Sequence, residues 1–263
     1  MKRLILAAFA AMLTAAMPAA AQDAAARGLQ IVREAERRDA GWRDAEVAMT
    51  MVLQDRKGAT RERTLRMMML EVPGERGGDK SIAIFDSPPD LKGTILLTHT
   101  RIGADDNQWL YLPGLKRVKR ISSSNKTGAF FASEFAYEDI AAPEVGRYNY
   151  VYLGQKACGS LTCSTVEERP DYRNSGYSKL VAYIDTQAYR TQRIEYFDGR
   201  GTLLKVLDFG GYRQAGGRFW RPQVLTMSNR KTGRTTILRY GRWSLGTGLS
   251  DATFSQQNLR NIQ

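Results

Sequence analysis

From Glu46 onward, apolar and polar residues alternate with period two, which is the pattern of a β-strand with one buried face. On the first predicted strand, Val47, Met49, Met51 and Leu53 point one way while Thr50 and Gln54 point the other. The second strand, predicted for 61–71, places Leu65, Met67 and Met69 on one face against Thr64, Arg66 and Met68.

Turn signals separate these alternating segments along the rest of the chain. They include Asp198-Gly199-Arg200-Gly201, Gly216-Gly217 and Lys231-Thr232-Gly233. About eleven hairpin-connected strands without an internal repeat predict one strongly curved antiparallel sheet. The fold class is therefore mainly β, as a half-open, unclosed antiparallel barrel.

Helical patterns are confined to the ends and to one insertion. Residues 23–40 carry an apolar stripe at Ala25, Leu29, Val32 and Ala35, and Gly41 ends the helix. A short final helix is predicted over 251–259, capped by Asp251.

The insertion follows a predicted hairpin whose arms, 108–113 and 117–121, turn at Gly114. Ser122 to Ser124 and Gly128 make a polar connector, after which four aromatic residues recur at a spacing that suits one side of a helix: Phe130, Phe131, Phe135 and Tyr137. We predict a helical lid over a hollow, hinged at the connector. A helix face buried in an ordinary core is the alternative.

The segment from Asp105 to Ile140 resembles the corresponding part of the outer-membrane lipoprotein-sorting proteins of the LolA-like superfamily. The resemblance extends over nearly all of the chain after the first few tens of residues. It implies a monomeric periplasmic carrier that holds a lipid or lipidated protein under helical flaps and moves it between the inner and outer membranes. It also implies an inner-membrane exporter as partner, no cofactor and no catalysis. Two other functions stay open, a scaffold of the envelope whose hollow is filled by its own side chains and a glycan or lipid hydrolase.

Methionine is the side chain that adapts to apolar ligands of variable shape, and five of the nine methionines lie on the first two strands. Ordinary core packing is the competing interpretation. We predict a cargo cavity lined by Met49, Met51, Leu53, Leu65, Met67, Met69, Ile84 and Trp109.

The N-terminus has the three parts of a secretory signal. Lys2 and Arg3 precede an apolar run, 4–16, and small residues up to Ala21 predict cleavage after that residue, which places the protein in the periplasm. The apolar run is too short to span the membrane, and Gln22 stands where a lipid-modified cysteine would be needed. The predicted organisation is a signal peptide, 1–21, and one carrier domain, 22–263.

The formal charge is +12, and removing the signal would leave +10. In an exported protein this charge favours anionic lipid head groups, acidic glycans or acidic partner proteins over nucleic acid. A candidate docking patch beside the lid consists of Arg101, Lys116, Arg117, Lys119, Arg120 and Lys126.

Cys158 and Cys163 are the two cysteines of the chain, and their spacing suits a disulfide that joins the arms of a hairpin in an oxidising compartment. The closed loop is short, so the expected stabilisation is about 2 kcal/mol. Two thiols without a nearby histidine make at most half a zinc site, and no metal is predicted.

Candidate catalytic groups are few. The one histidine, His99, lies in a strand beside Ile95 and Leu97 without a serine or cysteine nucleophile in a suitable setting. Carboxylates occur at Asp105, Asp106, Glu134, Glu138 and Asp139. Asp105 and Asp106 suit a turn, and Glu138 and Asp139 either end the predicted lid helix or face solvent. The sequence predicts a protein that is not an enzyme.

Overall fold

The computed structural model describes residues 19–74, 78–122, 125–141 and 144–262. Residues 1–18 of the predicted signal peptide (1–21) and the connector residues 123–124 lie outside this part. The strands of the first half are β1 (Asp44–Gln54), β2 (Thr60–Leu70), β3 (Lys80–Ser87), β4 (Ile95–His99), β5 (Asn107–Leu112) and β6 (Arg117–Ile121). Those of the second half are β7 (Tyr148–Cys158), β8 (Leu161–Pro170), β9 (Lys179–Asp185), β10 (Thr191–Phe197), β11 (Leu203–Gly210), β14 (Val224–Asn229), β15 (Thr235–Tyr240) and β16 (Ser244–Leu245). A separate small hairpin pairs β12 (Arg213–Ala215) with β13 (Phe219–Arg221).

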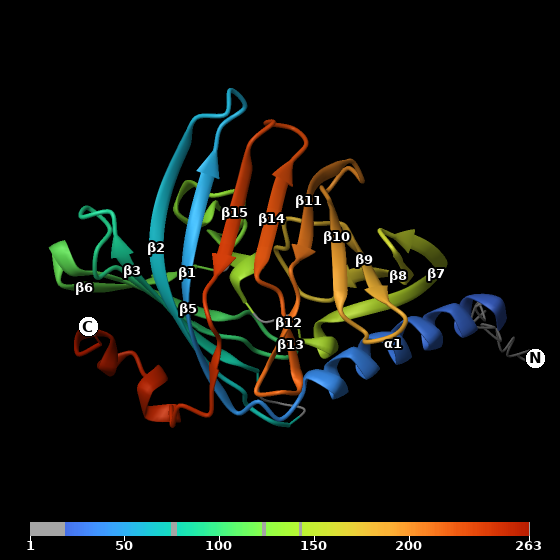
Figure 1. Cartoon of the computed structure of the whole chain (residues 1–263), viewed down its shortest axis with the longest axis horizontal. Helices are drawn as coiled ribbons and strands as arrows, with labels where there is room; N and C mark the ends of the chain where they lie inside the picture. Colours follow the sequence, from blue (N-terminus) through green and yellow to red (C-terminus); the bar gives the residue numbers. More distant parts are fainter. Residues whose placement is uncertain (1–18, 75–77, 123–124, 142–143, 263) are drawn as a thin grey trace, which may run out of the picture.

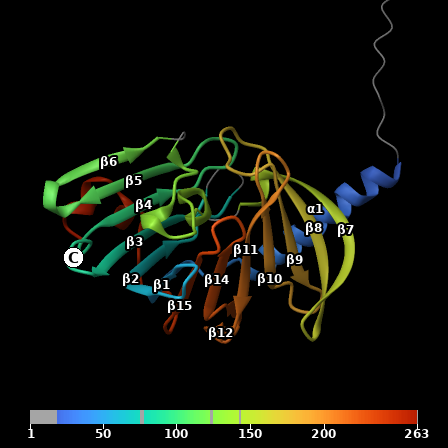
Figure 2. The same ribbon diagram turned by 90° about the horizontal axis from the view of Figure 1, so that it is seen from above.

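The main sheet has fourteen strands in the order β6-β5-β4-β3-β2-β1-β15-β14-β11-β10-β9-β8-β7, with β16 paired to β1. Figure 2 shows these strands following one another along an arc that stays open between β6 and β7 in the part of the chain that the structure describes. The predicted half-open antiparallel fold is confirmed. The structure has more strands than predicted, in part because strands of two or three residues carry too few alternations to be recognised.

The one α-helix of the described residues, α1 (Ala19–Asp39), begins four residues earlier than expected and lies along β7 (Figure 1). Ile31 packs with Val145, Tyr150 and Val166, so α1 covers the end of the sheet that contains β7 and β8. A Cβ on Gly28 would lie 2.9 Å from the backbone nitrogen of Tyr152, and glycine therefore permits this close approach.

The remaining helical elements are short 3₁₀ turns: η1 (Pro113–Leu115), η3 (Phe130–Ala132), η4 (Tyr137–Ile140), η5 (Val145–Arg147), η6 (Asp251–Phe254) and η7 (Gln257–Arg260). The predicted final helix is thus two separate turns. Phe254 and Leu259 from these turns are fully buried against Ile82, Ile84 and Leu97, which gives the β3–β5 part of the sheet a second covered face.

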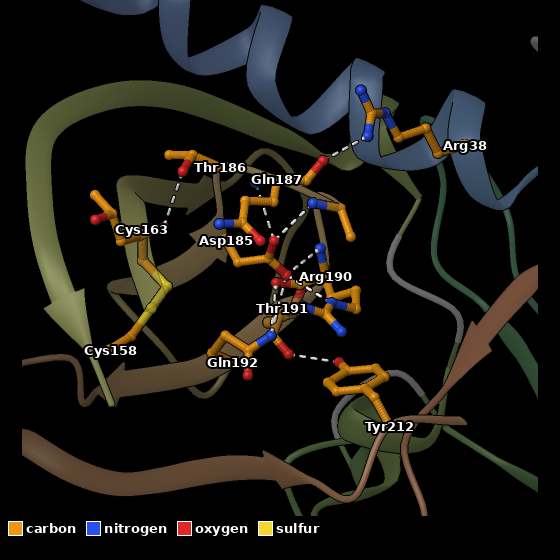
Figure 3. A network of polar contacts seen from close by, with 12 residues as sticks. Arg38, Cys158, Cys163, Asp185, Thr186, Gln187, Arg190, Thr191, Gln192 and Tyr212 are labelled. Carbon is orange, nitrogen blue, oxygen red and sulfur yellow. Dashed lines mark hydrogen bonds and ion pairs between the residues drawn. A yellow bond between two sulfur atoms is a disulfide. The ribbon is translucent and has the colours of Figure 1, made fainter. Parts of the chain in front are cut away.

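Cys158 and Cys163 form the predicted disulfide across the β7–β8 hairpin, with their Cα atoms 5.9 Å apart. Beside it, the turn between β9 and β10 is organised by Asp185 (Figure 3). The buried carboxylate accepts hydrogen bonds from the backbone N–H of Ala188 at 2.7 Å and from Arg190 Nε at 2.8 Å. Burial raises the pKa of Asp185, but these donors together hold that pKa below the usual range.

We expect Asp185→Ala to lower the free energy of unfolding by about 3 to 5 kcal/mol, because it leaves the mostly buried Arg190 without its counter-ion. The matched control is Asp208→Ala, which removes an ion pair with Arg193 in which both side chains are more than two-fifths exposed, and should cost less than about 1 kcal/mol. Urea denaturation of both variants gives the comparison. Equal losses would mean that Asp185 does not organise the turn.

Candidate functional site

The concave face of the sheet is filled by residues 125–141, here called the plug, which lie inside the arc between β6 and β7 (Figure 2). Phe130 and Phe135 are almost fully buried, at 1% and 2% exposure. They belong to one apolar cluster with inward-facing residues of both halves of the sheet, among them Met49, Met51, Leu65, Phe85, Leu96, Leu207, Met227 and Leu238. Closure of the concave face is therefore made by the chain's own aromatic side chains.

The plug is not the helix that the aromatic spacing predicted. Phe131 and Ala132 have φ values of 46° and 56°, in the left-handed region of the backbone. This conformation costs about 1 to 2 kcal/mol for each residue that has a Cβ atom. A single β-bridge joins Ala129 to Ala136, and Phe130 N donates to the oxygen of Phe135 at 2.7 Å. This compact, strained loop directs the rings of Phe130 and Phe131 onto Phe85, with centroid distances of 5.8 and 4.5 Å.

Polar contacts attach the plug to the sheet. Lys205 Nζ of β11 donates to Asp139 Oδ2 at 2.5 Å and to the main-chain carbonyl oxygen of Glu134 at 3.1 Å. Tyr177 OH donates to Asp139 Oδ1 at 2.8 Å, and Asn229 Nδ2 donates to Glu134 Oε2 at 2.6 Å. The Lys205 and Asp139 side chains are only 5% and 3% exposed, so this ion pair is taken out of water.

Two further contacts hold the other side of the plug. Arg63 Nη1 of β2 donates to the main-chain oxygen of Phe131, and Gln108 Nε2 of β5 donates to the main-chain oxygen of Tyr137 at 3.0 Å. Burial lowers the pKa of Arg63. The plug is thus attached to strands on both sides of its aromatic cluster.

A pocket of about 410 Å³ opens between the plug and the sheet at this polar end. Its lining includes Glu134, Glu138, Tyr177, Lys205 and Asn229, with Phe135 among the apolar residues. One step along the inward face of β11 from Lys205 lies Leu207, which belongs to the apolar cluster. The concave face is therefore polar at the pocket and apolar farther in.

Glu138 is the least satisfied carboxylate of the site. Its Oε1 accepts from Gly176 N at 2.9 Å, while Oε2 is buried with no hydrogen-bond partner among the described residues. Burial and, less strongly, the neighbouring Asp139 raise the pKa of Glu138 to about 7, against the opposing effects of Lys126 and Lys205.

Because this pKa is raised on folding, the folded protein binds the Glu138 proton more tightly than the unfolded chain does. The contribution of this proton to stability is therefore complete below about pH 4.5 and is lost as the pH rises toward about 7. We expect the wild type to lose about 2 to 3 kcal/mol relative to Glu138→Gln between pH 5 and pH 8. Urea titrations at both pH values measure this difference, and a difference that does not change with pH would contradict it.

Five of the eight predicted cavity residues belong to the concave cluster or pack against it: Met49, Met51, Leu53, Leu65 and Met67. Met69 follows on the same face of β2 but lies outside that cluster. The prediction is wrong for Ile84 and Trp109. Both residues lie on the convex face, in the cluster that contains Phe254 and Leu259. All four predicted lid residues, Phe130, Phe131, Phe135 and Tyr137, contribute to the concave cluster.

The predicted basic patch does not form one surface. Lys126 is buried. Its Nζ donates hydrogen bonds to Asp105 Oδ1 and to the main-chain oxygen of Arg173, and it lies over the ring of Tyr172. Arg101 lies in the loop before β5, whereas Lys116 and Arg117 lie at the turn after it. Because β5 has six residues, the two ends of the strand are about 20 Å apart. Lys119 is exposed on β6, and Arg120 donates to Asn107 Oδ1 at 2.6 Å.

The candidate catalytic groups have structural partners. His99 Nε2 lies 2.6 Å from the Phe254 oxygen and its ring packs edge-on against Trp109, beside Ile95 and Leu97 as the alternation predicted. Asp106 pairs with the buried Arg147. Within the described residues, no group of three or more His, Cys, Asp or Glu side chains is placed to hold a metal ion. None of the described helices is long and apolar enough to cross a membrane.

Comparison with known proteins agrees with this architecture. A family model described as "uncharacterized protein" matches residues 77–261. The crystal structure of an outer membrane lipoprotein-sorting protein domain from Vibrio parahaemolyticus is 40% identical, with a TM-score of 0.87, and the alignment covers 90% of this chain and 99% of that one. This protein belongs to the same family as that outer-membrane lipoprotein-sorting domain, and its fold is LolA-like.

More distant structures share the fold. A DUF1329 family protein from Desulfovibrio piger is 24% identical, with a TM-score of 0.84 over 90% of this chain and 99% of that chain. A LolA superfamily protein from Nitrosomonas europaea is 19% identical, with a TM-score of 0.71 over 88% of this chain and 98% of that chain. No curated protein sequence matches the chain.

Proposed function

We propose that this protein is a periplasmic carrier that binds the acyl chain of a lipid or lipidated protein on the concave face of its sheet and moves it between the inner and outer membranes. The observation that carries the proposal is the plug. Its aromatic rings occupy an apolar face built by both halves of the sheet, while its carboxylates Glu134 and Glu138 line the polar pocket. An acyl chain that replaces these rings gains about 25 cal/mol per Å² of buried apolar surface, which gives usable affinity without preventing release.

Two features support a plug that can be displaced. Its backbone contains the strained pair Phe131 and Ala132, and strain of this kind gathers where a structure has a second state. Its attachment also relies on a few directed polar contacts, and the buried Lys205–Asp139 pair contributes little net stability relative to apolar packing.

The compartment and the partners belong to the same proposal. The signal-like N-terminus and the disulfide support export to the periplasm, with cleavage after Ala21. The β5–β6 turn supports docking to an inner-membrane exporter or an anionic membrane surface, because Leu115 is 61% exposed there beside Lys116 and Arg117. The protein would act as a monomer, without cofactor or catalysis.

A scaffold role for the envelope is the second candidate, and the closed concave face favours it, since Phe130 and Phe135 already fill the interior. Native mass spectrometry of protein purified from the periplasm, followed by lipid extraction, separates the two functions. A carrier retains lipid and binds an added fluorescent fatty acid. Protein that carries no lipid and binds no fatty acid would contradict the carrier function, and conversion of an added lipid ester would indicate a hydrolase.

A further inference from the structure

Three hydrogen-bond donors on or beside the sheet contact two of the three carboxylates of the plug, Asp139 and Glu134. Lys205 Nζ and Tyr177 OH contact the two oxygens of Asp139 at 2.5 and 2.8 Å, and Asn229 Nδ2 contacts Glu134 Oε2 at 2.6 Å. The three donors come from β11, from the residues before β9, and from β14, and all three residues line the same pocket. They converge from separate parts of the sheet on negative charge supplied by the plug.

The plug therefore places carboxylates and aromatic rings on one surface in a fixed arrangement. The carboxylates meet the polar end of the concave face, while Phe130 and Phe135 enter the apolar cluster with Met51 and Phe85. An amphiphile with an anionic head group and one acyl chain has the same order of charge and apolar surface.

Displacing the plug would leave the Lys205 ammonium without its counter-ion. The side chain is 5% exposed, and besides its hydrogen bonds to the plug it contacts the ring faces of Tyr177 and Tyr196, at 5.0 and 5.1 Å from the ring centroids. Leu207 and Met227 lie in the apolar cluster beyond it. A buried cation without a partner is strongly unfavourable, so a ligand that displaces the plug must supply an anion at this place or leave Lys205 uncompensated.

On the basis of the function proposed above, we infer that Lys205, Tyr177 and Asn229 form a head-group site for an anionic amphiphile, and that Asp139 of the plug occupies this site in the absence of cargo. The recognised chemistry is a phosphate or carboxylate attached directly to an acyl or alkyl chain. Neutral and cationic amphiphiles of the same chain length lack the negative charge that the buried Lys205 ammonium requires.

The test compares dodecyl phosphate, dodecanol and dodecylamine, each below its micelle concentration or solubility limit, by calorimetry on the mature protein, residues 22–263. We expect dodecyl phosphate to bind at least about tenfold more tightly than dodecanol, on the scale of one charge-assisted hydrogen-bonded pair, and dodecylamine to bind weakest. Lys205→Met should reduce the ratio of the phosphate and alcohol affinities to about one. The control Lys231→Met, an exposed lysine in the β14–β15 turn, should leave this ratio unchanged.

Because Lys205→Met also leaves Asp139 buried without a cation, two further variants keep the test informative if that variant folds poorly. Asp139→Asn removes the internal anion and keeps Lys205, so it should tighten dodecyl phosphate more than it tightens dodecanol. The double variant Lys205→Met with Asp139→Asn restores neutrality and should bind both probes with similar affinity.

The outcomes distinguish this inference from the carrier function on which it rests. Binding of dodecanol as tight as that of dodecyl phosphate in the wild type would overturn the head-group site and leave the carrier function standing. Binding of none of the three amphiphiles would contradict the carrier function itself. Inorganic phosphate that binds as tightly as dodecyl phosphate would show a site for free anions and would also overturn the inference.

Discussion

Phe135→Ala is expected to bind a fluorescent fatty acid at least about tenfold more tightly than the wild type, although it folds less stably. Phe135 is 2% exposed within the concave cluster, and removing its ring takes about 3 to 5 kcal/mol from the packed plug. If the fatty acid binds only when the plug is displaced, the apparent affinity rises with the fraction of displaced plug. Fluorescence titration measures the affinity and urea denaturation measures the stability.

The matched control is Phe254→Ala. Phe254 is also fully buried, but it lies on the convex face under the C-terminal 3₁₀ turns. Its loss should destabilise the protein by a similar amount and leave the fatty-acid affinity unchanged. Equal affinities for all three proteins would mean that the plug is permanent core and not a competitor of cargo.

Met51→Glu is expected to prevent folding or to lower the free energy of unfolding by more than about 3 kcal/mol. Met51 has no exposed surface, and it pairs with Leu238 in the centre of the concave cluster, so a carboxylate there would be buried without a partner. Ala48→Glu provides the control, because Ala48 is an exposed residue on the same strand and should tolerate the charge within about 0.5 kcal/mol.

Circular dichroism and denaturant titration of these two variants decide how the methionines are used. A cooperatively folded Met51→Glu protein of normal stability would show that water reaches Met51 and that the concave face is open. The structure instead predicts that Met51 becomes accessible to ligand only after the plug has moved.

The strands and the inward face of β1 and β2 could be predicted because polar residues such as Thr50, Thr64 and Arg66 mark the opposite face. Alternation then assigns Met49 and Met51 to the interior. The same reasoning failed for Ile84 and Trp109, because β3 to β5 are covered on both faces, by the plug and by the C-terminal turns. An element buried on two sides loses the alternation that tells its faces apart.

The plug was predicted as a helix because four aromatic residues recur at helical spacing. The segment is too short to offset the cost of nucleating a helix, and its conformation is determined by contacts with distant strands, such as those from Lys205 and Gln108. Sequence reasoning also missed Lys205 as a site residue. The available signal was a single lysine at an inward position of the apolar strand Leu203–Gly210, where a buried charge requires a partner.

The most direct test of the carrier account is to lock the plug in place. Glu134 N donates to Thr236 Oγ1 at 2.9 Å, so these neighbouring residues of plug and β15 can be replaced together as Glu134→Cys with Thr236→Cys and joined by oxidation. The single variant Thr236→Cys and the wild type, each treated with oxidant and reductant, control for the native disulfide. The measurement is fatty-acid binding before and after reduction. We predict that the locked protein binds no fatty acid and that reduction restores binding to the level of the controls, whereas equal binding by the locked and reduced forms would contradict displacement of the plug by cargo.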